Sequence, residues 1–256
     1  MIYPRIYPVL LIHEEQLYKT INFENLKYIG DPINAVKIFN EKNVDELMIC
    51  DISATVNSTE PNYSLLSDIA EEARMPLCYA GGLKKFVQLE KIIQIGFEKV
   101  GVSSSCLNSI EFIKKFSDNF GSQSINIILD IKEINKEYYI FTHNGKRNTF
   151  RLLKEFNFAE FENYVGEFIF NSIDRDGTMI GLDENLLKLI ENISPTRHKS
   201  IIGGIGNLEH IKSLFRSYKN FNLGIGSFFL YKGELNAVLL NYLSKENKNE
   251  IFENFN

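Results

Sequence analysis

The stretch Phe168-Ile-Phe-Asn-Ser-Ile-Asp-Arg-Asp-Gly-Thr178 joins an apolar run to a charged segment. The apolar half has the composition of a buried strand, and Gly177 in the polar half suits a turn. In proteins built on parallel strands, ligands bind beyond the carboxyl ends of those strands. Asp174, Asp176 and Thr178 are therefore the first candidates for a site, and a solvated turn is the alternative for this stretch taken alone.

Strand-like runs and amphipathic helical segments alternate along the whole chain. The expected strands are Arg5–Ile12, Glu46–Asp51, Pro76–Ala80, Lys99–Ser103, Ile125–Asp130, Phe168–Ile173, Ser200–Gly203 and Asn222–Gly226. The expected helices are Pro32–Phe39, Tyr63–Ala73, Val87–Ile93, Ile110–Phe116, Leu152–Val165, Leu186–Ile193, Leu208–Tyr218 and a last one ending near Tyr242. Eight strand–helix pairs without a low-complexity break predict one α/β domain over residues 1–256, a (β/α)8 TIM barrel.

Two segments depart from this alternation. Alternating residues and the pair Asn144-Gly145 predict a β-hairpin over Glu137–Lys146, inserted before the next helix. The polar tail Lys245–Asn256 is expected to cover or to leave the bottom of the barrel.

Composition argues against several classes of protein. The formal net charge of −5 gives no reason to expect nucleic acid, which demands a surplus of Lys and Arg. The sequence after Met1 does not resemble a signal peptide and no apolar run is long enough to span a bilayer, so a cytoplasmic location without membrane contact is expected. The cysteines and histidines lack metal-ligand or disulfide spacing and are expected to be structural, with no metal or cofactor; they are Cys50, Cys78, Cys106, His13, His143, His198 and His210.

The two halves of the chain resemble each other. Ala80-Gly81-Gly82 corresponds to Ile202-Gly203-Gly204, and Val100–Ser103 corresponds to Leu223–Gly226, with Ser104 and Ser227 next. A barrel of two such halves places a glycine-rich pair of strand ends on each side of one mouth, where backbone N–H groups suit an anion. The repeat therefore predicts a substrate with a phosphate at each end, and glycines kept only for tight turns are the alternative.

Three further blocks are more specific than barrel motifs: Asn22–Leu26 with Gly30-Asp-Pro32, Phe120–Gln123, and Ser172–Thr178. With these blocks, the chain from Arg5 to about Tyr242 resembles the cyclase subunit of imidazole glycerol phosphate synthase of histidine biosynthesis. The resemblance implies a heterodimer with a glutaminase. Ammonia made by the glutaminase would pass through the barrel to the opposite mouth, where it splits and cyclises a bisphosphorylated ribulosyl intermediate.

The resemblance assigns an ammonia gate of paired charges to Arg5, Glu46, Lys99 and Glu167, at the amino ends of strands. Four charges at the end of an apolar barrel are costly unless paired. A salt-bridged plug without a role in transport is the alternative.

The catalytic residues of the family are only partly retained. Of its two acid–base aspartates, the second matches Asp130, but the first falls on Leu11, which cannot transfer a proton. The family's lysine is kept as Lys19, and Asp176 joins these as a catalytic candidate. The loop Leu11–Glu15 also lacks the family's glycine, which leaves His13, Glu14 and Glu15 as possible substitutes for the missing acid.

The remaining carry-over concerns phosphate and substrate binding. Some positions depart from the family's residue types, among them Gly101, Ser103, Asn144 and Asn171. The expected binding residues are Asp51, Gly81, Gly82, Ser103, Ser104, Asn144, Asn171, Asp174, Gly177, Thr178, Gly203, Gly204, Gly226 and Ser227.

Three functions are compatible with this pattern. The favoured one is a paralogue that delivers ammonia for another amidation, beside a sugar amidotransferase in nucleotide-sugar or surface-polysaccharide synthesis, because Leu11 replaces a catalytic acid. The alternative is a cyclase of histidine biosynthesis with a rearranged first loop. A scaffold without catalysis is disfavoured, since it would not require the gate charges together with Asp130 and Asp176.

Overall fold

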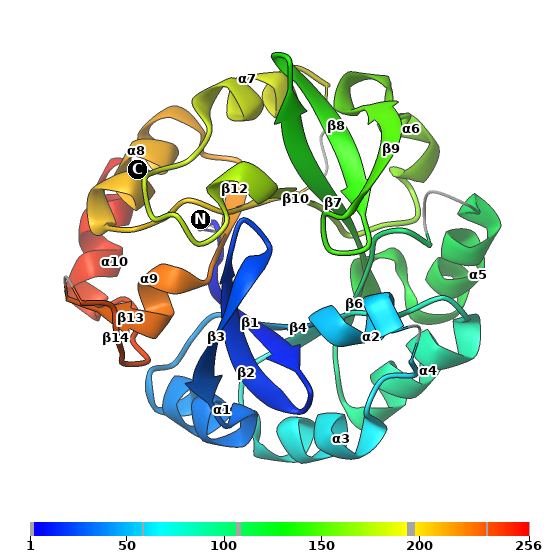
Figure 1. Cartoon of the computed structure of the whole chain (residues 1–256), viewed down its shortest axis with the longest axis horizontal. Coiled ribbons are helices and arrows are strands. Elements are labelled where there is room, and N and C mark those ends of the chain that lie inside the picture. The colour runs from blue at the N-terminus through cyan, green and yellow to red at the C-terminus, as the bar shows by residue number, and fades with distance from the viewer. Residues whose placement is uncertain (1–2, 58, 106–108, 194–197, 234, 256) are drawn as a thin grey trace.

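The computed structural model describes residues 3–57, 59–105, 109–193, 198–233 and 235–255. Eight parallel strands form a closed barrel, because β7 pairs with β10 and so joins the two ends of the strand order. Helices surround the barrel, as Figure 1 shows in a view onto one mouth. This confirms the predicted (β/α)8 fold.

The barrel strands agree with the predicted ones to within a few residues. Their order around the barrel is β1 (Ile6–His13), β4 (Leu47–Asp51), β5 (Leu77–Ala80), β6 (Lys99–Val102), β7 (Ile125–Ile134), β10 (Glu167–Ser172), β11 (His198–Ile202) and β12 (Phe221–Ile225).

Most of the predicted helices are also present. They are α1 (Pro32–Glu41), α3 (Tyr63–Glu72), α4 (Phe86–Ile95), α5 (Ile110–Phe120), α7 (Glu184–Ile193) and α8 (Leu208–Ser217), with the short α2 (Ile52–Asn57) between β4 and α3. Side-chain caps fix several starts: Asp31 Oδ1 accepts from Asn34 N at 2.8 Å, and Asn207 Oδ1 accepts from His210 N at 2.9 Å.

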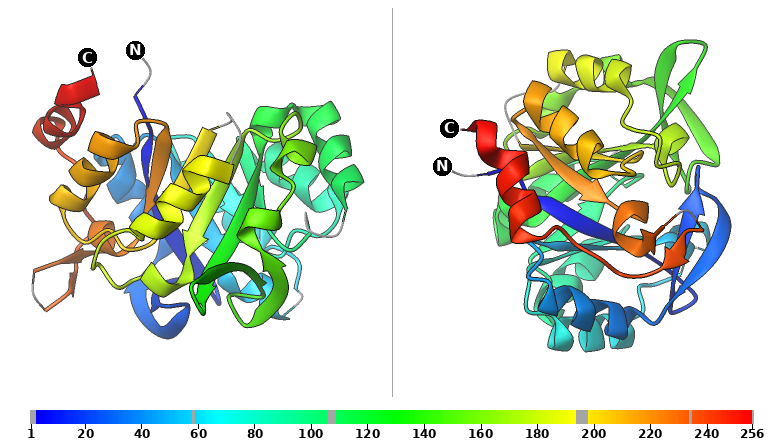
Figure 2. Two further views of the ribbon diagram at one scale, coloured as in Figure 1. Left: turned by 90° about the horizontal axis from the view of Figure 1, so that it is seen from above. Right: turned by 90° about the vertical axis from the view of Figure 1, so that its left-hand side faces the viewer.

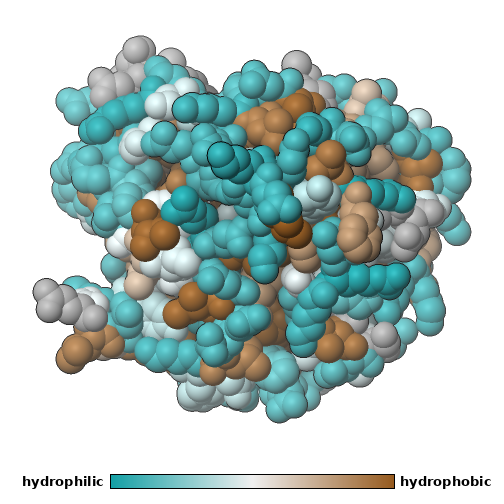
Figure 3. All heavy atoms as spheres, turned by 45° about the horizontal axis from the view of Figure 1, so that its top comes forward, coloured by the Kyte–Doolittle hydropathy of each residue, from teal (hydrophilic) through white to brown (hydrophobic). Residues whose placement is uncertain are grey.

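Apolar side chains form two separate clusters. The larger one lies between the strands and the surrounding helices. The smaller one fills the barrel interior and consists of Tyr7, Val9, Met48, Cys78, Ala80, Ile128, Ile169 and Ile202. The visible face is largely hydrophilic with separate apolar patches (Figure 3), as expected for a folded domain whose apolar residues are mostly inside.

Two hairpins stand over the mouth at the carboxyl ends of the strands. The predicted hairpin is confirmed as β8 (Glu137–Thr142) and β9 (Arg147–Leu152), and β7 extends to pair with β8. The other, β2 (Gln16–Ile21) with β3 (Glu24–Gly30), extends β1 and was not predicted. Both project on the side opposite to the chain termini (Figures 1 and 2).

Two predicted helices are wrong. The segment 152–165 holds only the 3-10 turn η2 (Leu153–Glu155) and α6 (Phe158–Phe161). Its aromatic residues pack together instead, with the rings of Phe156 and Phe161 stacked at a centroid distance of 5.4 Å. The segment before Tyr242 holds α9 (Ser227–Leu230) and a small hairpin, β13 (Tyr231–Lys232) with β14 (Ala237–Val238), whose turn includes Gly233 at φ +73°.

The tail forms a helix, α10 (Lys245–Phe252), followed by η4 (Glu253–Phe255). It packs near the amino end of β1: the Tyr3 ring stacks on Phe252, and Lys248 Nζ lies 2.6 Å from Asp45 Oδ1. The tail therefore covers one edge of the barrel bottom. Within the described part of the chain, no helix combines the length and the apolar character that crossing a membrane requires.

Candidate functional site

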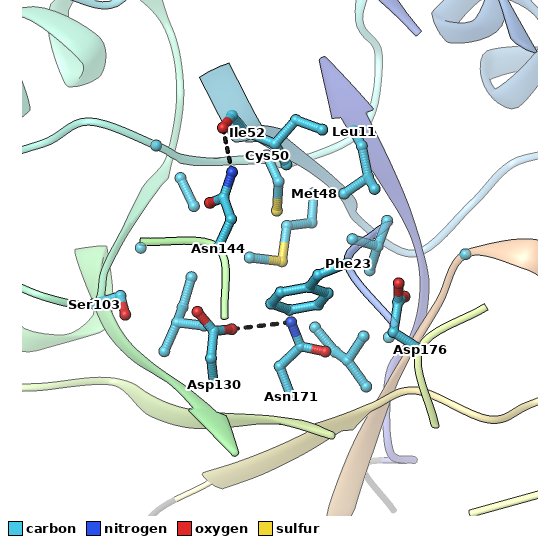
Figure 4. A pocket seen from close by; sticks show the side chains of 18 of the residues that line it. Leu11, Phe23, Met48, Cys50, Ile52, Ser103, Asp130, Asn144, Asn171 and Asp176 are labelled. Atoms are coloured by element: carbon cyan, nitrogen blue, oxygen red, sulfur yellow. Dashed lines mark hydrogen bonds between the residues drawn. The ribbon is translucent and has the colours of Figure 1, made fainter. Parts of the chain in front are cut away.

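A pocket occupies the mouth at the carboxyl ends of the strands, beneath the two hairpins. Side chains from β1, β4, β7 and β10 and the segments that follow the strands converge on it (Figure 4). Its floor reaches Val9, Met48 and Ile128 inside the barrel. The sequence placed its candidate site at this end of the strands.

Asp130, at the middle of β7, points into the pocket. Its Oδ1 accepts a hydrogen bond from Asn171 Nδ2 at 3.1 Å (Figure 4). Burial raises the pKa of Asp130 to about 7, against the lowering effect of the Asn171 hydrogen bond and with a further raising effect from Asp176. A carboxyl group with this pKa can give or take a proton near neutral pH.

Lys19 and Asp176 form a buried ion pair beside the same pocket. Lys19 Nζ, on β2, lies 2.6 Å from Asp176 Oδ1, and Thr20 Oγ1 donates to Asp176 Oδ2 at 2.8 Å. A backbone bond from Asn22 N to Asp176 O at 2.9 Å adds to this connection. Gly177 completes it, because a Cβ there would lie 2.2 Å from Thr20 O. The β2–β3 hairpin is thus tied to the loop after β10.

Leu11 lies across the pocket from Asp130, with Met48 and Phe23 between them in Figure 4. The three suggested substitutes for the missing acid do not line the pocket. Glu14 and Glu15 are exposed in the turn between β1 and β2, where Glu15 Oε1 accepts from Asn62 Nδ2 at 2.7 Å, and the His13 ring contacts Tyr18. The side of the mouth facing Asp130 is therefore apolar at the end of β1.

The two glycine-rich pairs of strand ends lie on opposite sides of the pocket, since β5 and β6 are four strands away from β11 and β12. All the predicted glycines and serines of both pairs line it: Gly81, Gly82, Ser103, Ser104, Gly203, Gly204, Gly226 and Ser227. Packing alone requires some of these glycines. A Cβ on Gly81 would lie 2.4 Å from Asp51 O, and one on Gly204 would lie 2.1 Å from Gly181 O.

Ser227 differs from these glycines because it carries a polar atom. It is buried, it lines the pocket, and its Oγ has no hydrogen-bond partner among the described residues. A buried hydroxyl without a partner is uncommon in folded proteins and points to a ligand or water.

Asp51 and Asn144 line the pocket and also hold its loops in place. Asp51 Oδ1 accepts from the backbone N of Ser53 at 3.0 Å and of Ala54 at 2.9 Å, which caps α2. Asn144 Nδ2, in the turn between β8 and β9, donates to Ile52 O (Figure 4). Both side chains therefore join the βα loops around the mouth.

Two predicted binding residues, Asp174 and Thr178, are not among the pocket's lining residues. Asp174 Oδ2 accepts from Glu133 N at 2.8 Å, and Thr178 Oγ1 donates to Arg175 O at 2.9 Å. They shape the loop after β10 while Asp176 and Gly177 reach the pocket. The 3-10 turn η3 (Ile173–Arg175) turns Asp174 away.

The pocket also includes residues that sequence reasoning did not select, namely Phe23, Thr20, Cys50 and His143. Phe23, in the tip between β2 and β3, has φ +64° and extends its ring into the middle of the mouth. A Cβ on Gly145 would lie 3.1 Å from the Phe23 ring, so the tips of the two hairpins approach each other here. In the sequence, Phe23 could have been selected because it lies in the Asn22–Leu26 block, one of the specific blocks of the family resemblance.

The predicted gate residues meet at the opposite end of the barrel. Glu46 Oε2 pairs with Arg5 Nη1 and with Lys99 Nζ, the latter at 2.5 Å. Glu167 Oε2 lies 2.8 Å from Arg5 Nη2, and its Oε1 accepts from Asn222 Nδ2 at 2.7 Å. We call Arg5, Glu46, Lys99 and Glu167 the charged ring; its formal charges balance.

The described residues contain no group of three or more His, Cys, Asp or Glu side chains suited to a metal ion. Cys78 is buried, and Cys50 is half-buried at the pocket wall. Burial raises the thiol pKa of Cys50 to about 12, with further raising effects from Asp130 and Asp51. Cys106, which was also expected to be structural, lies outside the described residues.

A (β/α)8 barrel with titratable side chains at the carboxyl ends of its strands has the architecture of barrel enzymes. A family model described as "Histidine biosynthesis protein" matches residues 5–236, and the chain belongs to this family.

Relatives that match along nearly their full length are named as HisF or hisF2 subunits, some of them as putative ones. A "Putative imidazole glycerol phosphate synthase subunit HisF" of Leptospira borgpetersenii is 43% identical over 98% of this chain and 100% of the relative. A "Putative imidazole glycerol phosphate synthase subunit hisF2" of Pseudomonas aeruginosa is 40% identical over 94% of this chain and 96% of the relative. An "Imidazole glycerol phosphate synthase subunit HisF" of Thermotoga sp. (strain RQ2) is 30% identical over 97% and 98%.

Proposed function

We propose that this chain is the synthase subunit of a glutamine amidotransferase complex. It receives ammonia from a glutaminase subunit at the charged ring and uses or delivers that ammonia at the opposite mouth, for amidation of a phosphorylated substrate. One observation carries this proposal: the same barrel has the charged ring, whose formal charges cancel, at its amino end and the pocket that contains Asp130 at its carboxyl end.

The charged ring supports a role at an entrance. Glu46 and Glu167 are 3% and 2% exposed, a position in which carboxylates are costly without partners. Burial acts to lower the pKa of Arg5, but Glu167 and Glu46 raise it above its ordinary value, so the Arg5 guanidinium stays charged between its two carboxylate partners. A neutral, hydrogen-bonded cap of this kind excludes ions and still offers polar contacts to ammonia.

The proposed catalytic residues are Asp130, Lys19 and Asp176. Asp130 has a pKa near neutrality, which suits proton transfer, and Lys19 with Asp176 places an ion pair at the mouth. Ser227 and the glycine pairs on opposite sides of the pocket are the proposed contacts for a phosphate at each end of the substrate.

Leu11 favours amidation of a substrate other than the histidine-pathway intermediate. An acid–base pair needs a second group across from Asp130, and the end of β1 offers an apolar side chain there. The substrate we propose belongs to nucleotide-sugar or surface-polysaccharide synthesis, where a separate sugar amidotransferase consumes the ammonia. The second candidate, cyclisation in histidine biosynthesis, follows from the subunit names of the relatives.

The test supplies the purified chain with ammonium salt and the histidine-pathway intermediate, so that no partner is required. Loss of one general acid is expected to slow turnover by at least about 10²-fold relative to an ordinary family member. Leu11→Asp should restore part of the rate if the pocket still fits that substrate, and Leu11→Asp combined with Asp130→Asn should abolish the restored activity.

Each outcome decides between the two candidates. Full activity in the unmodified chain would reject the sugar-amidation function and establish the cyclase. No recovery in Leu11→Asp would reject the cyclase function and direct the search to other acceptors.

A further inference from the structure

The barrel interior contains a fully buried polar layer between the charged ring and the pocket. Successive inward side chains on a strand are two residues apart. Each of β1, β5, β7 and β11 therefore contributes one inward residue to this layer and its next inward residue to a second layer nearer the pocket. The upper layer is Val9, Ala80, Ile128 and Ile202, all of which line the pocket. The lower one, which we call the polar layer, is Tyr7, Cys78, Asn126 and Ser200.

The polar layer touches the charged ring but not the pocket. Ser200 Oγ donates to Glu167 Oε1 at 2.5 Å, which joins the layer to the ring. All four side chains are at most 1% exposed, and none of them is among the residues that line the pocket. A molecule travelling from ring to pocket must therefore pass through this layer.

Two polar atoms in the layer make no hydrogen bond of ordinary geometry within the described part of the chain, although the pKa of the Tyr7 hydroxyl, which burial raises, is lowered in part by the nearby Ser200 side chain. They are the Tyr7 hydroxyl and Asn126 Oδ1, on strands that lie on opposite sides of the barrel. The other end of the Asn126 amide makes only a weak contact, with Nδ2 3.9 Å from Cys78 Sγ. Buried polar atoms are normally satisfied, so two orphans in one layer, pointing into the barrel interior, indicate a missing hydrogen-bonding molecule.

We propose that the polar layer is a binding station for one ammonia molecule, in which Tyr7 donates to the ammonia nitrogen and Asn126 Oδ1 accepts from one of its N–H groups. This inference rests on the proposed passage of ammonia through the barrel. The station makes Tyr7 and Asn126 positioning residues for transfer between the ring and the pocket.

The inventory of donors and acceptors favours neutral ammonia. The station offers one strong donor, the Tyr7 hydroxyl, and acceptors at Asn126 Oδ1 and Cys78 Sγ, which matches a molecule with one lone pair and several N–H groups. Ammonium would have no lone pair for the Tyr7 hydroxyl. It would also bring a charge into a buried layer above a ring whose own charges cancel. Water, which also donates and accepts, is the competitor that the test must separate.

The first experiment is crystallographic and requires neither partner nor acceptor. Crystals of the chain are soaked at a pH above the pKa of ammonium, either in ammonium chloride or in sodium chloride. The expected result is density between Tyr7 and Asn126 in ammonium chloride alone, and none in Tyr7→Phe. Density in both soaks would identify a resident water molecule. Density in neither soak would show that no ammonia binds between the two side chains. Each of these results overturns the proposal.

The second experiment measures coupling in the complex with the glutaminase, as product formed per glutamine hydrolysed. Tyr7→Phe and Asn126→Leu are each expected to lower this ratio by about three- to tenfold, the effect of one lost hydrogen bond. Their rates with ammonium salt, which enters from the pocket, should remain within about twofold of the unmodified chain. An unchanged ratio in both variants would overturn the station.

Tyr79→Phe is the matched control for both experiments. The Tyr79 hydroxyl is equally buried and equally without a partner, but its ring packs on Phe97 in the cluster outside the barrel. It should change neither density nor coupling. If the unmodified complex forms no product from glutamine with any acceptor, the proposed function fails, while the two soaks still decide whether the station exists.

Discussion

Asp130 holds its proton more tightly than an ordinary carboxyl group because it is buried in the pocket with a single neutral hydrogen-bond donor, Asn171. The same environment that makes it useful for proton transfer opposes its ionised form. Part of the stability of the fold is therefore given up at neutral pH to keep this group at the mouth.

The stability of the protein should depend on pH through Asp130. Its folded pKa of about 7 exceeds the ordinary value of 3.8, so the folded state binds more protons between these values and the stability is lost as pH rises through that window. Asp130→Asn is uncharged throughout. We expect it to raise the free energy of unfolding by about 1–4 kcal/mol at pH 8.

Urea unfolding at two pH values measures this difference. At pH 4 the unmodified side chain is protonated in the folded state, so the gain of Asp130→Asn should vanish there. An equal gain at both values would mean that burial does not hold the proton on Asp130, and that the catalytic assignment lacks its electrostatic basis.

At the scale of elements, the β2–β3 hairpin depends on contacts with the loop after β10. Those contacts are the Lys19–Asp176 ion pair, the Thr20 hydrogen bond and the close approach at Gly177. They place Lys19 and Phe23 over the pocket, so this hairpin carries site residues although it lies outside the barrel itself.

Gly177→Ala should break this junction. Its φ is +73°, and an added Cβ would lie 2.2 Å from Thr20 O, so both strain and a backbone clash oppose the substitution. We expect a loss of about 3 kcal/mol or more in urea unfolding. Gly233→Ala is the control, since Gly233 has the same φ of +73° and, apart from its chain neighbours, no atom of the described residues lies within 4 Å of the added Cβ.

The control isolates the clash from the backbone strain. Gly233→Ala should cost only about 1 kcal/mol, the penalty for a left-handed conformation. Similar losses in the two variants would show that the hairpin does not press on Gly177, and that the loop can move away from it.

The elements that sequence predicts well are those whose pattern is local. The barrel strands were predicted because their apolar runs are short and bounded by glycine or polar residues. The first pocket candidates followed from a strand end, whereas the gate residues came from the family resemblance. The helix over 152–165 and the last helix failed because apolar residues there pack as aromatic clusters or short hairpins, which composition does not separate from a helix. Asp174 lies outside the pocket lining because it is part of the 3-10 turn η3 and accepts a hydrogen bond from Glu133 N, which the sequence pattern does not reveal.

Other features depend on residues far apart in the sequence. Leu11 could be placed opposite Asp130 only through the family resemblance. The polar layer needs the registers of four strands at once, because Tyr7, Cys78, Asn126 and Ser200 share no motif. Periodicity alone identifies inward positions but not which of them meet.

At the scale of the whole molecule, the two ends of the barrel have different characters. The amino end carries the charged ring and the nearby tail helix α10, and the carboxyl end carries the pocket and its hairpins. A protein that receives a small molecule at one end and reacts it at the other requires this polarity.

The chain should form a 1:1 complex with a glutaminase through its amino face. Co-expression and size-exclusion chromatography with light scattering would measure the stoichiometry. The complex should form without substrate, since the charged ring is already assembled in the free chain. If the chain stays alone beside every glutaminase of its genome, the proposed source of ammonia is wrong.

The half-barrel repeat leads to a prediction about ligand size. Its two glycine-rich pairs lie on opposite sides of one pocket, so two phosphate groups joined by a flexible spacer can occupy both sides at once. Linking two weak groups makes the second contact intramolecular, which strengthens binding by about 10²–10⁴-fold when the spacer matches the separation. Calorimetry should therefore find a bisphosphate of sufficient length bound at least about 10²-fold more tightly than inorganic phosphate.

Ser227→Ala should weaken bisphosphate binding by about three- to tenfold, because it removes the buried, unpartnered hydroxyl from one side. A bisphosphate that binds no better than phosphate would leave a single anion site, and would mean that the glycines of the other side serve only the close packing of its loops.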